Sequence, residues 1–267
     1  MPVESLPETV LVPGGEFMMG TEEGGEDERP VHPVTVEAFH LAVHPVTMSQ
    51  YARFLRETGH RPPAVYELPL IVANGGRERE QVFRSLAAPY AWSDGTPDQA
   101  RLEHPVALVK WEDATAYCTW LSAITGNPVR LPTEAEWERA ARGGQPGRRY
   151  PWGDSIDTSR ANYLADAGRR RDAGTTPVCR YEANAYGLHD MIGNVWEWVL
   201  DWYERDFYAH STRTNPRGPV MGSMRIVRGG GWPTSEPHML TCSYRHKVPP
   251  DTYSYSIGFR IAYTAGA

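Results

Sequence analysis

The stretch from Tyr186 to Tyr203 reads YGLHDMIGNVWEWVLDWY, and the rest of the chain is interpreted outward from it. It contains three of the nine tryptophans, a density typical of a protein core, and three acids among them. A buried carboxylate is costly unless it is paired or bound to a metal. The turn signal Gly193-Asn194 lies between Asp190 and Glu197, so carbonyls and carboxylates together offer the oxygen ligands that Ca²⁺ prefers. The alternative is a surface turn whose acids face water.

The size and composition indicate one large globular domain. The chain has 267 residues, of which 40% are hydrophobic and 22% charged. Its formal net charge of −6 favours neither nucleic acid nor an anionic membrane as a partner. No apolar run approaches the roughly 20 residues that span a bilayer, and Met1 to Pro13 lacks the features of a signal peptide. We therefore expect a cytoplasmic protein.

The three cysteines do not form a recognisable framework. Cys118, Cys179 and Cys242 are too widely spaced for a disulfide scaffold or a zinc site, and reduced thiols fit the cytoplasm. Cys118 lies on the apolar face of a predicted helix that ends at Gly126, so we expect it in the core.

Capping boxes and turn residues predict a mixed fold. Thr47-x-x-Gln50 and Thr133-x-x-Glu136 each match the start of a helix. Gly and Pro are frequent elsewhere, which favours short strands and long irregular segments. The segment 60–103 is predicted to be a long structured surface loop, and such loops are usually functional. The fold class is therefore α+β, a single domain with low regular secondary structure.

Several segments together carry a resemblance to a known family. They occur in family order over nearly the whole chain: Val12–Gly20, His104–Val106, Arg130–Glu138, Pro151–Gly153, Gly187–Trp198, Arg228–Gly230 and Ile257–Arg260. The chain thereby resembles the formylglycine-generating enzymes, also called sulfatase-modifying factors. The resemblance implies one domain over residues 1–267, of the C-type-lectin-like variant seen in that family, with an insertion around 60–103.

The resemblance also implies two structural calcium sites. The residues that match the second site are Asp190, Gly193, Val195 and Glu197. Those that match the first site are Asn162, Tyr163 and, in the loop that follows, Asp172. Arginines at 169–171 crowd this loop where the family usually has glycines and acids, which puts the first site in doubt.

The cysteine pair of the true formylglycine-generating enzymes has no counterpart. In those enzymes two cysteines, five residues apart, follow a Gly-Gly-Ser-aromatic segment, bind copper and oxidise a substrate cysteine. Here Gly231 replaces the serine, and Thr234 and Met239 stand at the two cysteine positions. Threonine and a thioether cannot replace two thiolates, which are the ligands that select Cu(I). Whether another redox metal is present stays open.

The segment from Trp232 to Arg245 is the predicted cleft. Trp232 offers an apolar wall, His238 a base, Cys242 a thiol that Arg245 or His246 could activate, and Arg245 a fixed donor. The alternative for Cys242 is a half-buried small residue on a strand. His238 and His246 flank this segment and could meet in space.

Two functions from different classes follow. The leading hypothesis is a divergent family member that oxidatively modifies a peptide or a peptide-derived natural product, as cysteine-lacking relatives such as the pyoverdine-maturation proteins suggest. The rival is a non-catalytic, calcium-braced binding protein of the immunity or ligand-display type, whose loops meet a partner protein. Sulfatase activation itself is disfavoured by Thr234 and Met239.

Overall fold

The computed structural model describes residues 6–92, 94–165 and 174–264 of the chain. It shows a mixed helix and sheet domain, as the sequence predicts. Its α-helices are α1 (Met48–Thr58), α2 (Leu70–Ala73), α3 (Gly76–Ala87), α4 (Trp111–Thr125) and α5 (Glu134–Arg142). Short 3-10 helices are η1 (Glu26–Glu28), η2 (Ala88–Tyr90), η3 (Gln99–Arg101), η4 (Phe207–Ala209) and η5 (Pro237–Leu240).

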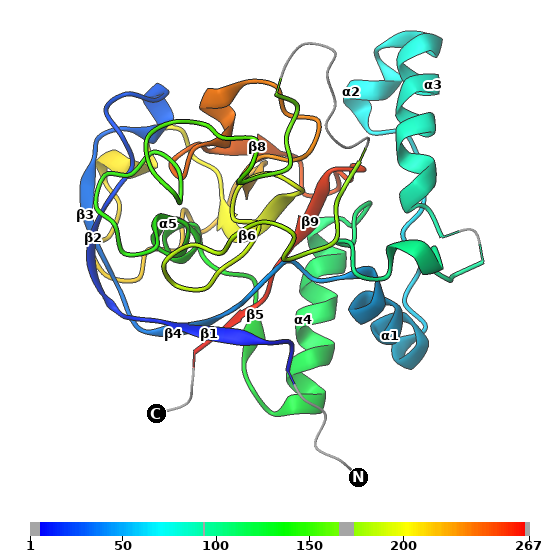
Figure 1. The fold of residues 1–267 in the computed structure, drawn as a ribbon, viewed down its shortest axis with the longest axis horizontal. Coiled ribbons are helices and arrows are strands. Elements are labelled where there is room, and N and C mark those ends of the chain that lie inside the picture. Colours follow the sequence, from blue (N-terminus) through cyan, green and yellow to red (C-terminus); the bar gives the residue numbers. More distant parts are fainter. Residues whose placement is uncertain (1–5, 93, 166–173, 265–267) are drawn as a thin grey trace.

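Three small sheets form the body of the molecule (Figure 1). The first has the order β1-β4-β10-β5, from strands Thr9–Val12, Phe39–Ala42, Ala262–Tyr263 and Val129–Arg130. The second pairs β2 (Gly15–Met19) with β3 (His32–Val36). The third has the order β8-β7-β6-β9, from His246–Val248, Arg225–Arg228, Trp196–Trp202 and Ile257–Phe259. Only the β6–β9 pairing in this third sheet is parallel, which brings the tryptophan-rich strand beside the C-terminal motif.

Both predicted capping boxes are confirmed. The Thr47 hydroxyl accepts a hydrogen bond from the Gln50 backbone N–H, and the Gln50 side chain accepts one from Thr47 N–H. Thr133 and Glu136 make the same reciprocal pair at the start of α5. Satisfying two otherwise unpaired donors at a helix start stabilises it by about 0.5–2 kcal/mol. Local sequence thus determines where α1 and α5 begin.

The segment 60–103 differs from the structured loop that the sequence predicts. It contains α2 and α3, which form a helical extension beside the body (Figure 1). On α3, Phe83 is buried and its ring lies 5.6 Å from that of Tyr255. The backbone N–H of Glu67 donates to the Tyr253 hydroxyl, which ties the start of the extension to the body. The charged run from Arg77 to Glu80 forms the first turn of α3.

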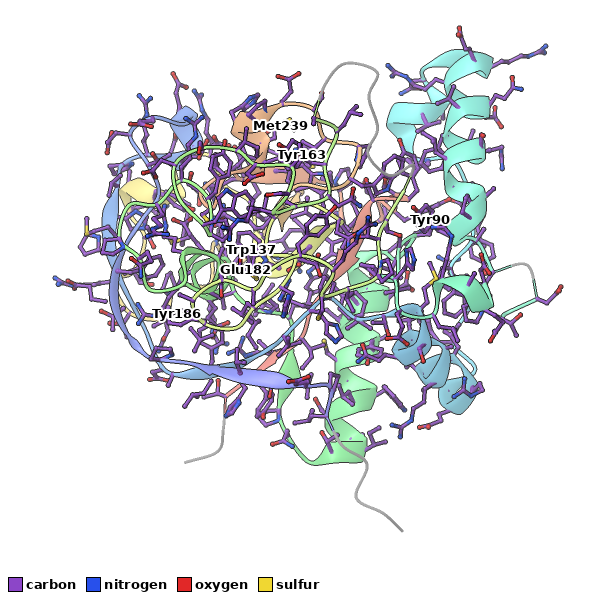
Figure 2. All side chains as sticks on the ribbon, in the orientation of Figure 1. Tyr90, Trp137, Tyr163, Glu182, Tyr186 and Met239 are labelled. Atoms are coloured by element: carbon purple, nitrogen blue, oxygen red, sulfur yellow. The ribbon has the colours of Figure 1, made fainter. Side chains whose placement is uncertain are left out.

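Two hydrophobic clusters fill the domain. One packs α1 and α4 against β6 and β9 and includes the buried Cys118, as predicted. The other packs α5, through Trp137, against β2, β3 and the end of β7. Figure 2 draws the side chains on the ribbon, with Trp137 labelled in the body of the molecule. Among the described residues, no helix has the length and apolar character needed to cross a bilayer.

Candidate functional site

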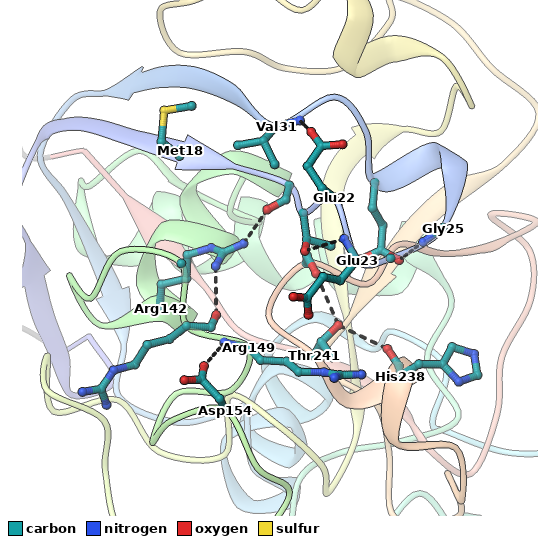
Figure 3. Close-up of a pocket in the computed structure, with 17 residues that line it drawn as sticks. Met18, Glu22, Glu23, Gly25, Val31, Arg142, Arg149, Asp154, His238 and Thr241 are labelled. Atoms are coloured by element: carbon teal, nitrogen blue, oxygen red, sulfur yellow. Dashed lines mark hydrogen bonds between the residues drawn. The ribbon is translucent and has the colours of Figure 1, made fainter.

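A cavity that borders the predicted cleft segment has a volume of about 770 Å³ (Figure 3). Three parts of the chain, far apart in sequence, surround it: the connection from Met18 to Val31, the segment from Arg142 to Asp154, and the turn from His238 to Ser243. Such a volume is typical of sites for small molecules or short peptides. We take it as the candidate site.

A buried ion pair on α5 builds the base of this cavity. Arg142 donates from Nε and Nη2 to one oxygen of Glu138, at 3.0 and 2.7 Å. The same guanidinium donates to the Gly20 carbonyl on one side and the Arg148 carbonyl on the other, each at 2.9 Å. Glu138 also accepts from Gly20 N–H at 2.8 Å. One planar group therefore fixes the separation of two loops, through four of its five N–H donors.

The walls above this base carry opposite charges. Figure 3 shows Glu22 and Glu23 above the cavity, with Arg149 and Asp154 below it. Glu22 accepts a hydrogen bond from Val31 N–H, which holds its carboxylate in place. The Arg149 guanidinium lies 5.9 Å from the centre of the Tyr150 ring, a cation–π contact. The cavity thus presents charged groups rather than an apolar slot.

Of the four predicted cleft residues, only His238 lines this cavity. Its ring is exposed, in the short helix η5. Trp232 is buried instead, and its indole N–H donates to the Tyr255 carbonyl at 3.3 Å. The prediction that Trp232 offers an open wall is therefore wrong: its ring is packed into the domain behind Tyr255.

Arg245 is a structural residue and not a donor for a ligand. Its guanidinium makes a two-pronged contact with Glu134, from Nε at 2.7 Å and Nη2 at 3.0 Å. Its third nitrogen donates to the carbonyls of Asp27 and Glu204, and its side chain has no exposed surface. The sequence prediction failed here because Glu134 is 111 residues away and enters only through the tertiary fold.

Cys242 is not an activated thiol. It is fully buried in the cluster around α5, and burial raises the pKa of its thiol to about 12. Arg142 lowers this pKa by less, because that guanidinium is already neutralised by Glu138. The alternative reading of Cys242, as a half-buried small residue, is closer to the structure than an activated thiol, although Cys242 is completely buried.

We predict that thiol labelling will separate the cysteines. Iodoacetamide at pH 8 should modify Cys179, which is exposed, and leave Cys118 and Cys242 unmodified in the native protein. Peptide mapping by mass spectrometry measures this, and the guanidinium-unfolded protein, in which all three should react, is the control. Native labelling of Cys242 would contradict its placement in the core.

The residues at the predicted cysteine positions are also unsuited to thiolate chemistry. Thr234 is buried, and its hydroxyl accepts a hydrogen bond from Gly231 N–H at 3.1 Å. Met239 is half-buried and packs against the cluster that contains Trp196. His238 and His246 do not contact each other directly but lie on either side of Tyr244, with ring centroids 5.7 and 6.3 Å from it. No group of three or more His, Cys, Asp or Glu side chains in the described ranges could hold a metal ion.

The residues of the second predicted calcium site are brought together in part. Asp190 is buried with a backbone φ of 54°, and Cys179 N–H donates to one of its carboxylate oxygens at 2.9 Å. Burial raises the pKa of Asp190 to about 6, and Glu197 adds to that rise. A buried carboxylate whose pKa is raised by burial is a suitable ligand for a bound cation, because the cation would balance its charge. Gly193 and Val195 lie in the turn between these two acids.

Glu197 already has a counter-charge. Arg260 donates to both its oxygens at 2.7 Å, and the Trp137 indole donates at 2.8 Å. Of the first predicted site, Asn162 and Tyr163 are buried, and the Asn162 amide donates to the Gly174 carbonyl at 2.9 Å. Asp172 lies outside the described residues.

We predict that Ca²⁺ stabilises the fold through Asp190. At a hundredfold excess over its dissociation constant, Ca²⁺ should raise the free energy of unfolding by about 2.7 kcal/mol. Asp190→Gly should remove most of this response, because it deletes the carboxylate while tolerating the positive φ. Thermal melting in Ca²⁺ and in chelator measures the effect. Identical curves for the unsubstituted protein would count against the site.

Sequence reasoning missed most residues that line the cavity. Glu22 and Glu23 belong to a connection that reads as an ordinary acidic loop, and Arg148 and Arg149 follow an ordinary helix end. The one available signal was Glu138 together with Arg142, two opposite charges spaced four residues apart on the helix predicted after Thr133. Such a pair indicates an ion pair but not which loops it holds.

The comparisons with known proteins agree with this fold. A family model described as the sulfatase-modifying factor enzyme 1-like domain matches residues 1–265. The formylglycine-generating enzyme of Streptomyces coelicolor is 35% identical over 95% of this chain and 88% of its own length. A protein named serine/threonine-protein kinase pkn1 from Chlamydia pneumoniae is 41% identical over 98% of this chain, which spans only 38% of that relative.

A solved structure is similar over nearly its whole length. PvdO from Pseudomonas aeruginosa superposes with a TM-score of 0.78 at 27% identity, covering 97% of this chain and 94% of that one. Together with the match of the family model over almost every residue, this shows that the chain belongs to the sulfatase-modifying factor enzyme 1-like family.

Proposed function

We propose that this chain is a binding member of its family, which holds a peptide segment or a peptide-derived molecule in the cavity between Glu22 and Arg149. The observation that carries the proposal is a contrast in accessibility. The cavity is open, its base is prebuilt by Arg142 and Glu138, and charged side chains face into it. The thiol Cys242 lies sealed in the core beside it.

The relative named a kinase supports a binding role. The chain corresponds to 38% of that protein, so a domain like this one is part of a longer protein named for a different activity. A recognition domain in a larger protein fits that arrangement. Calcium, where it binds, braces the turn at Asp190 and takes no part in recognition.

Oxidative modification of a peptide or peptide-derived product is the second candidate. It is favoured by relatives named formylglycine-generating enzyme, such as the one at 35% identity. Metal analysis of the purified protein separates the two candidates: retained copper or iron favours oxidation, and calcium alone favours binding.

We predict that the protein will not convert the cysteine of a sulfatase-motif peptide to formylglycine, with or without added copper. Both accessible cysteine positions of the family carry other residues, and burial keeps the Cys242 thiol protonated. Mass spectrometry of the incubated peptide is the measurement, with an active formylglycine-generating enzyme as the positive control. Conversion of the peptide would overturn the binding proposal.

A further inference from the structure

The two charged walls of the cavity are not paired with each other. Glu22 and Glu23 are exposed on one wall without a basic side chain among them, and the buried Glu28 beside them accepts a hydrogen bond from Gly25 N–H. Arg148 and Arg149 line the other, together with Asp154, whose carboxylate accepts the Arg149 backbone N–H at 3.3 Å. Within the described part of the chain, no ion pair joins the walls. Charges of both signs therefore face the open space.

The walls stay apart because their bases are fixed. Arg142 bonds the carbonyls of Gly20 and Arg148 at the same time, and Glu138 bonds Gly20 N–H. The Arg142–Glu138 ion pair that makes these hydrogen bonds is buried, so water does not compete with them. Collapse of one wall onto the other would break these contacts. The charged groups are thus already positioned before a ligand binds. Binding therefore loses less conformational entropy in the protein.

A second cavity of about 320 Å³ adjoins the first, and the two share Met18 and Arg142. Phe17, Pro146 and Tyr186 give the second cavity apolar surface, beside the charged Glu16 and Arg139. A single amino acid would occupy only one of these spaces. An extended chain can place a charged residue in the first and an apolar residue in the second.

We propose that the ligand is a polypeptide segment with both signs of charge. A basic side chain lies against Glu22 and Glu23, a carboxylate lies against Arg148 and Arg149, and an apolar residue reaches the second cavity. This inference rests on the proposed function and adds the chemistry of the ligand. A purely anionic ligand such as nucleic acid would face these two glutamates, and like charges brought together are repelled.

Defined peptides test the charge requirement. The probes are heptapeptides that carry an uncharged fluorophore at the N-terminus and an amide at the C-terminus, with one lysine, one glutamate and one phenylalanine among glycines, in every order. Companion peptides replace the lysine by norleucine, the glutamate by glutamine, or both. Fluorescence anisotropy at about 0.1 M salt should show the best two-charge peptide binding at least tenfold more tightly than either one-charge companion, and the preference should shrink in high salt.

Two exposed wall residues allow each charge to be removed separately. Glu23→Gln should abolish the preference for lysine and keep that for glutamate, and Arg149→Gln should do the reverse. The matched controls are Glu112→Gln and Arg56→Gln, exposed residues on α4 and α1 that do not line the cavity. They should leave all affinities unchanged within about twofold.

The outcomes distinguish this inference from the proposed function. One outcome is that two-charge, one-charge and neutral peptides bind with equal affinity, and that Thr241→Trp, which fills the cavity, still abolishes binding. That outcome would overturn the charge requirement alone. Failure of every heptapeptide and of a random peptide library to bind would overturn the proposed function as well. Residue-specific loss of each preference supports both.

Discussion

Replacing Glu138 with glutamine should lower the free energy of unfolding by about 3–5 kcal/mol, and the melting temperature by about 10 °C or more. Glu138 is fully buried and contacts two guanidinium groups, those of Arg142 at 2.7 Å and Arg228 at 2.6 Å. Burial alone would raise the pKa of this carboxyl, but the two arginines hold it below its usual range. Glutamine keeps the shape and removes the charge, so Arg142 loses its balancing anion and Arg228 keeps only Glu134.

The cost is large because the arginines cannot reach water. Arg228 has no exposed side-chain surface, and its remaining contacts are Glu134 and the carbonyls of Cys242 and Ser243. An unpaired buried charge costs far more than the pair contributes. Urea or guanidinium unfolding followed by fluorescence, which the nine tryptophans make sensitive, measures the change.

A matched control exists on α3. Glu80 and Arg84 have the same spacing of four residues as Glu138 and Arg142, but both side chains are exposed. Glu80→Gln should leave the melting temperature within about 1 °C of the starting value, because exposed ion pairs contribute little. Equal small effects at both positions would show that the Glu138 pair is not buried as described.

Arg260→Met should have an effect of similar size. Arg260 donates to both oxygens of Glu197 and to the carbonyls of Ala42 and His189, with no exposed surface. Its loss leaves the Glu197 carboxylate buried with only the Trp137 indole as a donor. We expect about 3–5 kcal/mol of destabilisation. Denaturant unfolding of the variant is again the measurement.

The double variant Glu197→Gln with Arg260→Met provides the control. In the double variant neither the Glu197 carboxylate nor the Arg260 guanidinium remains as an unpaired buried charge. The double variant should therefore be much more stable than the sum of the single effects predicts. Additivity within about 0.5 kcal/mol would mean that the two residues do not interact. That result would also return Glu197 to the role of a free calcium ligand.

Local features of the structure were predictable from the sequence because they depend on neighbours in the chain. Thr47 and Thr133 cap helices through residues three positions away, and Gly126 ends α4 in the left-handed conformation that glycine tolerates. The burial of Cys118 follows from the apolar face of one helix.

The cleft residues were mispredicted because their surroundings depend on distant segments. Whether Arg245 is free or paired is decided by Glu134, and whether Cys242 is reactive is decided by the packing around α5. No sequence pattern near Arg245 indicates Glu134, and none near Cys242 indicates the packing around α5. The cavity is a still harder case, since Arg142 joins loops that begin at Gly20 and Arg148, and nothing in either loop marks the other.

The central claim is that a ligand meets the cavity between Glu22 and Arg149 and not the segment around Trp232. Hydrogen–deuterium exchange of the protein, with and without the tightest peptide from the heptapeptide set, tests it most directly. We predict that binding slows exchange in 20–31 and 147–154 and leaves 251–257, beside Trp232, unchanged. Protection of 251–257 and of α3, with none in the two cavity loops, would contradict the account.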